Sequence, residues 1–431
     1  MYINIYIIIM SIEYIDVLPS NVDTTQPAGY SMGKPLLQFQ IGSQDAMLIG
    51  STVRFNGTFE RSGTGNEANA QWEPSLGIYN ILDQLHISSN KSSQTIEHIQ
   101  NYNRFLGSYI PATSSKDDLL GHMNTTSMTT CGELQCLRYA KTNGKFDFSI
   151  PLPCGLLFGR NPIPLSDNWG VKGLNINLHL APDSNVFFST AVGGDASGSV
   201  YQLTNISLTA EIMRPAPDQL SRLMKQTSNS FEYNSISSHY ASFNNSYATI
   251  NKNLGIKRCL SIFVNLVSSS HINNYAENGM ACMNVRQDDG SNADITEVIF
   301  TRGGIRYPLG YDIVSVQRDY PTSTSGDGQL LRNYLNALSP FSKLDRTTMN
   351  ALNATNLESL NTSHESTQPP NVYGVGVAYD TISGQGVDFS SEPFSMVIKS
   401  TLNTSNPTSA FIFAHNKASI IMNNQGIQVL E

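Results

Sequence analysis

The sequence predicts an all-β protein made of two tandem antiparallel β-sandwiches. Three observations lead to this prediction: apolar and polar residues alternate over many short segments, turn-forming residues separate these segments, and a proline-rich break divides the chain into two similar halves. Alternation with a period of two is typical of half-buried antiparallel strands. In residues 173–180, the leucine and isoleucine side chains share one face, whereas Asn175, Asn177 and His179 share the other.

The first half contains six segments with this strand pattern. They are residues 36–41, 51–60, 81–88, 145–150, 173–181 and 201–212. Turn clusters rich in Gly, Asn and Ser separate them, as at 63–70 and 193–198. Residues 95–109 differ, because their apolar side chains recur at helical spacing. We therefore expect one amphipathic helix in a connection of this half.

The break at 213–230, MRPAPDQLSRLMKQTSNS, predicts a linker with a short helix, since two prolines precede apolar residues at helical spacing. Strand patterns then resume at 231–243, 257–267, 295–309, 310–320, 395–402, 409–415, 418–424 and 426–430. A second amphipathic helix is expected at 328–341. The common sandwich with about eight strands is the jelly roll, built from four-stranded sheets. We predict two tandem eight-stranded antiparallel jelly rolls, with short helices in long loops.

These signals divide the chain into an N-terminal arm (1–30), a first roll (31–214), a linker (215–230) and a second roll (231–431). The arm begins MYINIYIIIMSIEYI, which has no basic residue before its apolar run and no small-residue cleavage site. This pattern argues against a signal peptide, and about ten apolar residues do not span a bilayer. We expect a β-rich arm that packs on its own protein or a neighbour; contact with a membrane or another partner is the alternative.

Composition restricts the function classes. The net charge is −8, so the chain lacks the basic balance typical of nucleic-acid-binding domains. Charged residues form only 14% of the chain, which indicates that neighbouring proteins cover much of its surface or that polar loops form it. The five cysteines are scattered and predict free thiols in a reducing compartment: Cys131, Cys136, Cys154, Cys259 and Cys282.

The sequence carries none of the common catalytic or ligand-binding motifs. The eight histidines show no zinc-binding spacing: His86, His98, His122, His179, His239, His271, His364 and His415. The sequence has no phosphate-binding loop and no G-x-S-x-G elbow. Residues 374–377, GVGV, favour a glycine turn or bulge over a nucleotide site. We therefore assign no catalytic, cofactor-binding or metal-binding residue, and we expect no cofactor.

Acidic residues leave two alternatives open. Residues 288–294 place Asp288, Asp289, Asn292 and Asp294 in one loop, but the loop lacks the central glycine and the closing glutamate of a calcium loop. A solvated turn is the preferred interpretation, and a divalent-ion site is the alternative. A glycosidase would pair carboxylates from distant strands, with Glu211 and Glu297 as examples of candidates.

Residues 150–165, IPLPCGLLFGRNPIPL, place an apolar run among prolines. We predict a buried connection between strands, or a surface that another chain covers. This crossing resembles the double-jelly-roll major capsid proteins of double-stranded DNA viruses, in the lineage of polinton-like and nucleocytoplasmic large DNA viruses. Those proteins carry a strand ending in I-P-L-P, an apolar turn, a second P-L, and then V-K with hydrophobic alternation. The matching residues are 150–153, 156–158, 164–165 and 171–180, and FNGTFERSG (55–63) lies where such proteins begin their first roll.

The resemblance implies a structural protein without enzymatic activity. Three copies would form a pseudo-hexameric trimer, and trimers would tile an icosahedral capsid, assembled inside the host cell, around double-stranded DNA. The implied partners are other copies of the chain in the trimer and in neighbouring capsomers, minor capsid or penton proteins, and an inner viral membrane reached by the N-terminal arm. Sequence-specific nucleic-acid binding is not expected. Polar loops at 61–75 and 110–130 would suit the outer surface.

Two other functions remain as alternatives. A tandem β-sandwich protein of a virion or adhesive structure could bind glycans, with Trp72 and Trp169 as candidate exposed aromatic residues. A β-sandwich hydrolase acting on polysaccharide would need a pair of carboxylates in one groove. The exposure of the two tryptophans and the separation of the candidate carboxylates discriminate between these alternatives and a capsid subunit.

Overall fold

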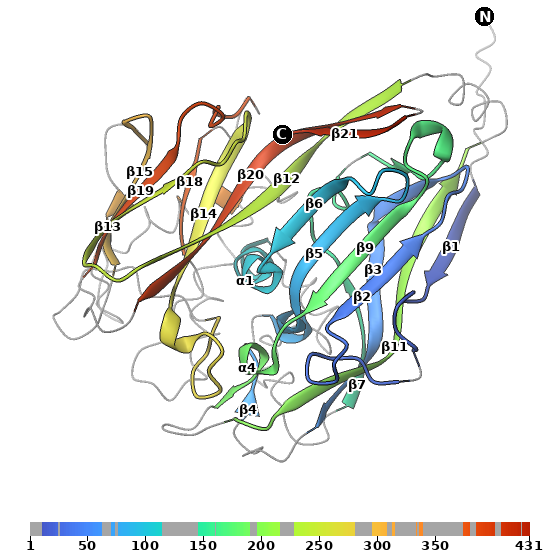
Figure 1. Ribbon diagram of the computed structural model, residues 1–431, viewed down its shortest axis with the longest axis horizontal. Coiled ribbons are helices and arrows are strands. Elements are labelled where there is room, and N and C mark those ends of the chain that lie inside the picture. The colour runs from blue at the N-terminus through green and yellow to red at the C-terminus, as the bar shows by residue number, and fades with distance from the viewer. Residues whose placement is uncertain are drawn as a thin grey trace, which may run out of the picture.

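The computed structural model describes most of both halves of the chain. The described residues are 11–24, 26–62, 70–73, 76–113, 145–159, 161–189, 196–215, 228–280, 295–307, 313–314, 333, 336–338, 374–379, 385–400, 407–423 and 425–431. They form two β-sandwiches that lie side by side (Figure 1). Among them, no helix is long and apolar enough to cross a membrane.

The first sandwich consists of two main sheets. One contains, in spatial order, β1 (Ser11–Val17), β11 (Val200–Arg214), β3 (Met47–Ser62) and β7 (Lys145–Pro151), with β8 (Ile163–Pro164) also on β3. The other contains β2 (Leu36–Ile41), β9 (Leu174–Leu180), β5 (Leu82–Ser89) and β6 (Thr95–Gln100). The smaller elements are β4 (Ala70–Gln71) paired with β10 (Phe188–Ser189), α1 (Tyr102–Thr113), α4 (Asp183–Val186), and 3-10 turns at Gly77–Ile81 and Asp167–Trp169.

The second sandwich is built in the same way. Its first sheet contains β12 (Ser228–Phe243), β20 (Thr408–Asn423), β14 (Cys259–Ser268) and β18 (Val375–Ala378), with β21 (Gly426–Leu430) also on β20. Its second sheet contains β13 (Tyr247–Lys252), β19 (Phe394–Ser400), β15 (Ile295–Arg302) and β16 (Ile305–Tyr307), with β17 (Ile313–Val314) also on β15. A 3-10 turn lies at Ser269–His271.

The two sandwiches have equivalent strands in the same chain order. The sheet β1-β11-β3-β7 corresponds to β12-β20-β14-β18, and β2-β9-β5-β6 corresponds to β13-β19-β15-β16. Every main-sheet pairing is antiparallel. Apart from the additional strands β8, β17 and β21, each sandwich therefore has two sheets of four strands, which confirms the predicted pair of eight-stranded antiparallel units. Residues 11–17 of the predicted arm form a strand that packs on its own protein.

The helix predicted at 95–109 is wrong in its first half. Residues 95–100 form strand β6, which pairs with β5, and the helix begins at Tyr102. Ile96 and Ile99 are three residues apart, which imitates helical spacing, but both are buried in a strand whose pairing with β5 is shifted at Ile96. Asn101, with φ at 53°, makes the turn between strand and helix.

Several strand boundaries also differ from the prediction. Residues 409–415 and 418–424 belong to one strand, β20, which pairs with β12 along its whole length. The predicted strand at 295–309 is the hairpin β15–β16, because Gly303 and Gly304 take positive φ at the turn. Strand β13 was not predicted, because its residues YATINK are only weakly apolar.

The glycine turn predicted at 374–377 is also wrong, since Val375–Ala378 is strand β18. Its glycines permit close contact: a Cβ on Gly374 would lie 1.9 Å from the carbonyl oxygen of Val264. Of the helix expected at 328–341, the described residues 333 and 336–338 are helical. The predicted linker helix within 216–227 and the acidic loop 288–294 lie outside the described residues, as do Cys131, Cys136 and Cys282.

Candidate functional site between the two sandwiches

The crossing at 150–165 reaches the second sandwich. Leu152, Cys154 and Leu157 are fully buried, and residues 155–158 form a turn. A Cβ on Gly155 would lie only 1.6 Å from the carbonyl oxygen of Asn234 on β12, so only glycine allows this approach. The predicted buried connection is therefore confirmed, and the second sandwich of the same chain helps to cover it.

Glu97, on β6, is the central polar residue of this junction. It is 2% exposed, and its carboxylate accepts hydrogen bonds from the backbone N–H groups of Gly155 (3.0 Å) and Leu156 (2.8 Å). It also accepts one from the N–H of Ile236 on β12, at 3.2 Å. One side chain thus holds three backbone donors from two sandwiches. Burial raises the pKa of Glu97 to about 7, although these hydrogen bonds act to lower it.

Strands β6 and β12 face each other at the boundary between the sandwiches (Figure 1). They are edge strands of different sheets, and side chains join them. The Tyr233 hydroxyl donates to the carbonyl oxygen of Ile96 (2.7 Å), and the N–H of Gln100 donates to Ser238 Oγ (2.8 Å). The edge of each sheet is therefore satisfied by the other sandwich rather than by solvent.

Helix α1 covers the outer face of the sheet β12-β20-β14-β18. Phe105 packs against Phe263 and Phe413, with ring centroids 6.0 and 5.9 Å away. The guanidinium carbon of Arg104 lies 4.2 Å from the ring centroid of Phe411. The Asn265 amide donates to the carbonyl oxygen of Arg104 (3.0 Å). The aromatic residues of this face join the hydrophobic core of the first sandwich, whereas the second sandwich also has a core of its own.

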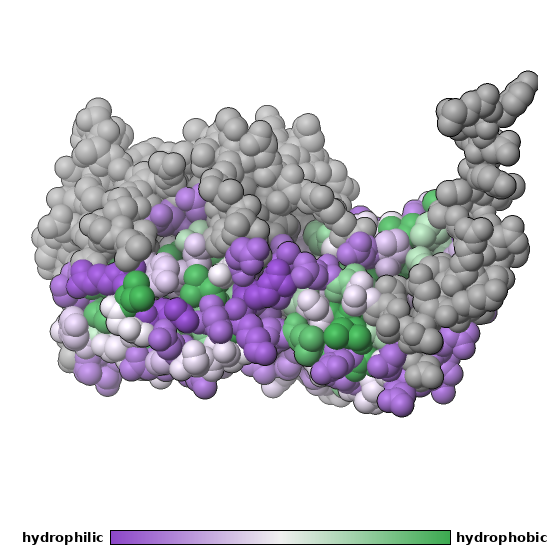
Figure 2. Space-filling view, turned by 90° about the horizontal axis from the view of Figure 1, so that it is seen from above, coloured by the Kyte–Doolittle hydropathy of each residue, from purple (hydrophilic) through white to green (hydrophobic). Residues whose placement is uncertain are grey.

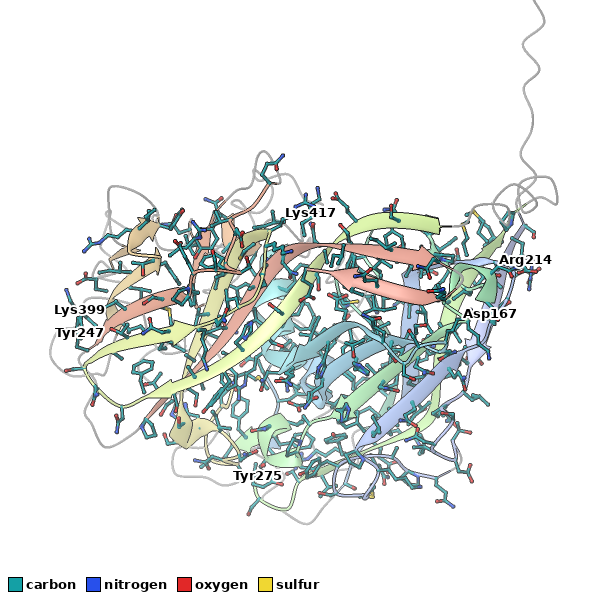
Figure 3. The ribbon with its side chains drawn as sticks, turned by 45° about the horizontal axis from the view of Figure 1, so that its top comes forward. Asp167, Arg214, Tyr247, Tyr275, Lys399 and Lys417 are labelled. Atoms are coloured by element: carbon teal, nitrogen blue, oxygen red, sulfur yellow. The ribbon has the colours of Figure 1, made fainter. Side chains whose placement is uncertain are left out.

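A second set of contacts lies at the other end of the junction. The carbonyl oxygen of Tyr275 accepts hydrogen bonds from the N–H groups of Ser189 (2.8 Å) and Ala196 (3.3 Å). The Asn278 amide donates to Glu73 Oε2 at 2.5 Å. In Figure 3, Tyr275 lies below the junction, far from Lys417 at its top. Contacts along the whole boundary thus hold the two sandwiches together.

An open groove of about 780 Å³ lies beside β6, β12 and β21. Its polar lining includes His98, Ser237, Lys257, Arg258 and Lys417. Arg258 and Lys417 both form ion pairs with Glu232, each at 2.7 Å, so these cations already have an acidic partner. In the view from above, a hydrophilic band runs between smaller apolar patches (Figure 2). The groove resembles a solvated seam more than a ligand pocket, which is typically lined by apolar side chains.

The structure brings some of the scattered histidines together. His86 and His98 lie opposite each other on β5 and β6, with ring centroids 5.3 Å apart, on the polar face that also carries His179. Burial, and then the charge of neighbouring histidines, lowers the pKa of both His86 and His98. Within the described residues, no group of three or more His, Cys, Asp or Glu side chains is arranged to hold a metal ion.

The candidate residues of the alternative functions are not assembled into a site. Trp72 is fully buried and packs against Phe59, with ring centroids 4.9 Å apart, so it is not the exposed aromatic residue that the glycan-binding alternative requires. The side chain of Trp169 lies outside the description. Glu211 and Glu297 lie on β11 and β15, in different sandwiches, and Glu297 forms an ion pair with Lys399. Cys154 and Cys259 are free and buried, as predicted for thiols.

Sequence reasoning found the crossing but missed Glu97, Arg104 and Tyr233. Glu97 is the single acid in the apolar strand TIEHI, which was a weak signal of burial. Its partner Ile236 is 139 residues away, so no local pattern identifies the contact. The described part of the junction consists of backbone donors, the Glu97 carboxyl group beside the buried Cys154 thiol, and packed aromatic rings.

Two equivalent eight-stranded sandwiches with a buried junction define a class of tandem jelly-roll protein. No known family and no curated protein matches the sequence of this chain. Solved structures do match its fold. The Faustovirus major capsid protein matches with a TM-score of 0.62 and 10% identity, covering 96% of this chain and 91% of that chain.

Two further structures extend the likeness. VP54 of PBCV-1, in a structure fitted into a reconstruction of the virophage Sputnik, matches with a TM-score of 0.60 and 11% identity, covering 98% of this chain and 97% of that chain. The mavirus major capsid protein matches with a TM-score of 0.51 and 9% identity, covering 97% and 90%. The chain therefore has the double jelly-roll fold of these capsid proteins.

Proposed function

We propose that this chain is a major capsid protein that self-assembles as a pseudo-hexameric homotrimer and tiles the icosahedral shell of a double-stranded DNA virus. The observation that carries the proposal is the pair of jelly rolls with the same strand order, packed side by side along a buried junction. Three such chains supply six similar units, which a threefold ring can arrange with nearly sixfold outline.

The physical character of the junction supports this role. A shell subunit must keep its shape while neighbours contact it on several sides. Here, buried contacts fix one roll against the other. They are made by helix α1, the 155–158 turn and Glu97. The low fraction of charged residues also fits extensive protein contacts, because the cores of such interfaces are depleted in charge.

The proposed capsid role implies a division of the chain into domains, a set of partners and a location. The proposed divisions are an arm (1–30), whose strand β1 joins a sheet of the first roll, then the first roll (31–214), a linker (215–230) and the second roll (231–431). The partners would be further copies of the chain, minor capsid or penton proteins, and an inner viral membrane reached through the arm. The protein would reside in the capsid shell after assembly inside the host cell. The charge of −8 gives no basis for sequence-specific nucleic-acid binding.

We propose a structural role rather than an enzymatic one. The two acids considered for glycosidase chemistry, Glu211 and Glu297, belong to different sandwiches, whereas hydrolysis needs two carboxyl groups within about 10 Å of each other around one bond. The buried Trp72 removes one of the two aromatic residues proposed for glycan contact.

The test is the molar mass of the purified chain by size exclusion with light scattering at neutral pH. We expect a species of three chain masses that persists on dilution, with a six-sided outline in negative-stain electron micrographs. Assembly of shells from this species, on its own or with minor capsid proteins, would follow. A chain that stays monomeric at all concentrations would contradict the proposal, and glycan-array binding by that monomer would favour the adhesive alternative.

A further inference from the structure

The strand equivalence between the rolls shows where a second copy of the chain should dock. Strand β12 is the first strand of the second roll and pairs with its last long strand, β20. Strand β1 is the first strand of the first roll and pairs with its last strand, β11. Likewise β6 and β16 are the second strands of equivalent hairpins, β5–β6 and β15–β16. The contact between β12 and β6 within the chain therefore has an equivalent, which would be made by β1 and β16.

Within the chain, the β12 side of the second roll is covered. The outer face of its sheet carries the cross-strand rows Ser238–Phe413–Phe263 and Ile236–His415–Ser261. Strand β6 contacts β12 along this edge, and α1 covers the phenylalanines. This shows which surface of one roll receives the β6 edge of another.

Among the described residues, none covers the equivalent surface of the first roll. Its cross-strand rows are Ile12–Met213–Met47 and Tyr14–Glu211–Ile49. Tyr14 is 80% exposed and Ile12 is 58% exposed, while Met47, Ile49 and Met213 are partly exposed. We call the five apolar residues of these rows the β1 face. Such a group of exposed apolar residues on an edge strand is unusual on a surface that meets only water.

The complementary edge lies at the opposite end of the molecule. Strand β16 is at the edge of its sheet, Ile305 on it is 47% exposed, and Arg306 is also exposed. The β1 side carries the exposed acid Asp16 and the partly exposed Glu211. The negative charges of these two residues are complementary to the positive charge of Arg306. Figure 1 shows β1 at one end of the long axis and β15 at the other, and Figure 3 shows Arg214, beside β1, far from Lys399 on β19.

We propose that the β1 face of one copy receives the β16 edge of the next copy, in the way that the β12 face receives β6 within the chain. This inference rests on the proposed function, because it assigns the contact of the homotrimer. The contact is heterologous: each copy offers two different surfaces at its two ends. Alternating with the three contacts inside the chains, three such contacts close a ring of six rolls.

A photo-crosslinker in place of Tyr14 tests the assignment in the full-length trimer. Copies with the crosslinker are mixed with isotope-labelled copies without it, and crosslinked peptides are identified by mass spectrometry. We expect links from position 14 to residues 295–307 of a labelled neighbour. The control places the crosslinker at Tyr247, which is 59% exposed on β13, the edge strand at the opposite side of its sheet from β16. It should give no intermolecular links.

A Tyr14→Arg variant provides a second readout. Glu211 beside it can accommodate the new charge, so the roll should fold, but the neighbour's Arg306 would repel it. We expect the concentration at which trimers half-dissociate to rise by at least about tenfold, with no change for Tyr247→Arg. Trimers that crosslink elsewhere and resist Tyr14→Arg would overturn the inference and leave the capsid function intact. A chain that never trimerises would overturn both.

Discussion

The outer faces of two equivalent sheets differ sharply. In the second roll, the sheet β12-β20-β14-β18 presents Phe263, Phe411 and Phe413, all buried beneath helix α1. In the first roll, the sheet β1-β11-β3-β7 presents Thr52, Arg54 and other polar side chains, with apolar residues gathered near β1. The face on the second roll is buried within the chain and stabilises its fold. The other is mostly polar, and its exposed apolar group at β1 is where we propose that a second copy docks.

The largest expected effect on stability comes from truncating a side chain on the buried face, compared with truncating one on the exposed face. We expect Phe413→Ala to lower the free energy of unfolding by about 3–5 kcal/mol, because it leaves a cavity beneath α1. Tyr14→Ala should cost under about 0.5 kcal/mol in the dissociated monomer, since its side chain is mostly exposed. Urea denaturation at low protein concentration measures both. Equal losses at the two positions would show that the faces do not differ in the way described.

Loss of the Glu97 carboxylate should have the next largest effect. Glu97→Ala leaves the N–H groups of Gly155, Leu156 and Ile236 buried without an acceptor. Each buried orphan donor costs on the order of 1 kcal/mol or more, so we expect a loss of about 3 kcal/mol in urea titrations.

The matched control for this loss is Glu60→Ala, which removes a surface ion pair with Lys145 (3.6 Å) and should change stability by under about 0.5 kcal/mol. If Glu97→Ala proved as mild as Glu60→Ala, the carboxylate would not be what joins the rolls.

A methyl group at Gly155 should also disturb the junction. Gly155→Ala would press a Cβ against the backbone of Asn234, and we expect it to cost about 2–3 kcal/mol, since the turn must move away from β12. Gly42→Ala is the control, because no atom lies within 4 Å of its added Cβ. Thermal unfolding monitored by circular dichroism would separate the two, and a stable Gly155→Ala protein would mean that the turn has room to adjust.

The parts of the fold that depend on local pattern were predictable. Strands β2 and β9 alternate cleanly, so their positions followed from a period of two. The strand at 95–100 was not predicted, because a shift in its pairing with β5 buries both Ile96 and Ile99 and breaks the alternation. The crossing at 150–165 was correctly predicted to be buried, but what covers it depends on β12, which lies far along the chain in the second roll.

The site was less predictable than the fold for the same reason. Glu97 lies in a strand, as does the partly exposed Glu60, and only the apolar neighbours of Glu97 hint weakly at its burial. Its burial arises only when two rolls meet. By contrast, the apolar residues of β1 were visible as an unusual N-terminal run, because an exposed apolar strand stands out against a chain so rich in polar residues.

The smallest expected effect is a pH dependence of the junction. Burial raises the pKa of Glu97 to about 7 from a usual value of 4.5, so the folded protein takes up a proton here more readily than the unfolded chain. The stabilisation is complete below about pH 4.5 and is lost as the pH rises through 7. We expect this group to reduce the free energy of unfolding by about 2 kcal/mol between pH 5 and pH 7.

Because His86 and His98 have lowered pKa values, their protonation destabilises the fold as the pH falls, which opposes the effect of Glu97. The comparison must therefore be made against Glu97→Gln, which keeps every histidine and removes only the titrating carboxyl. We subtract the free energy of unfolding of Glu97→Gln from that of the native chain. This difference should fall between pH 5 and pH 7, because only the native chain loses stability as Glu97 gives up its proton. A constant difference across that range would mean that Glu97 does not change its protonation there, and that the three backbone donors hold it charged throughout.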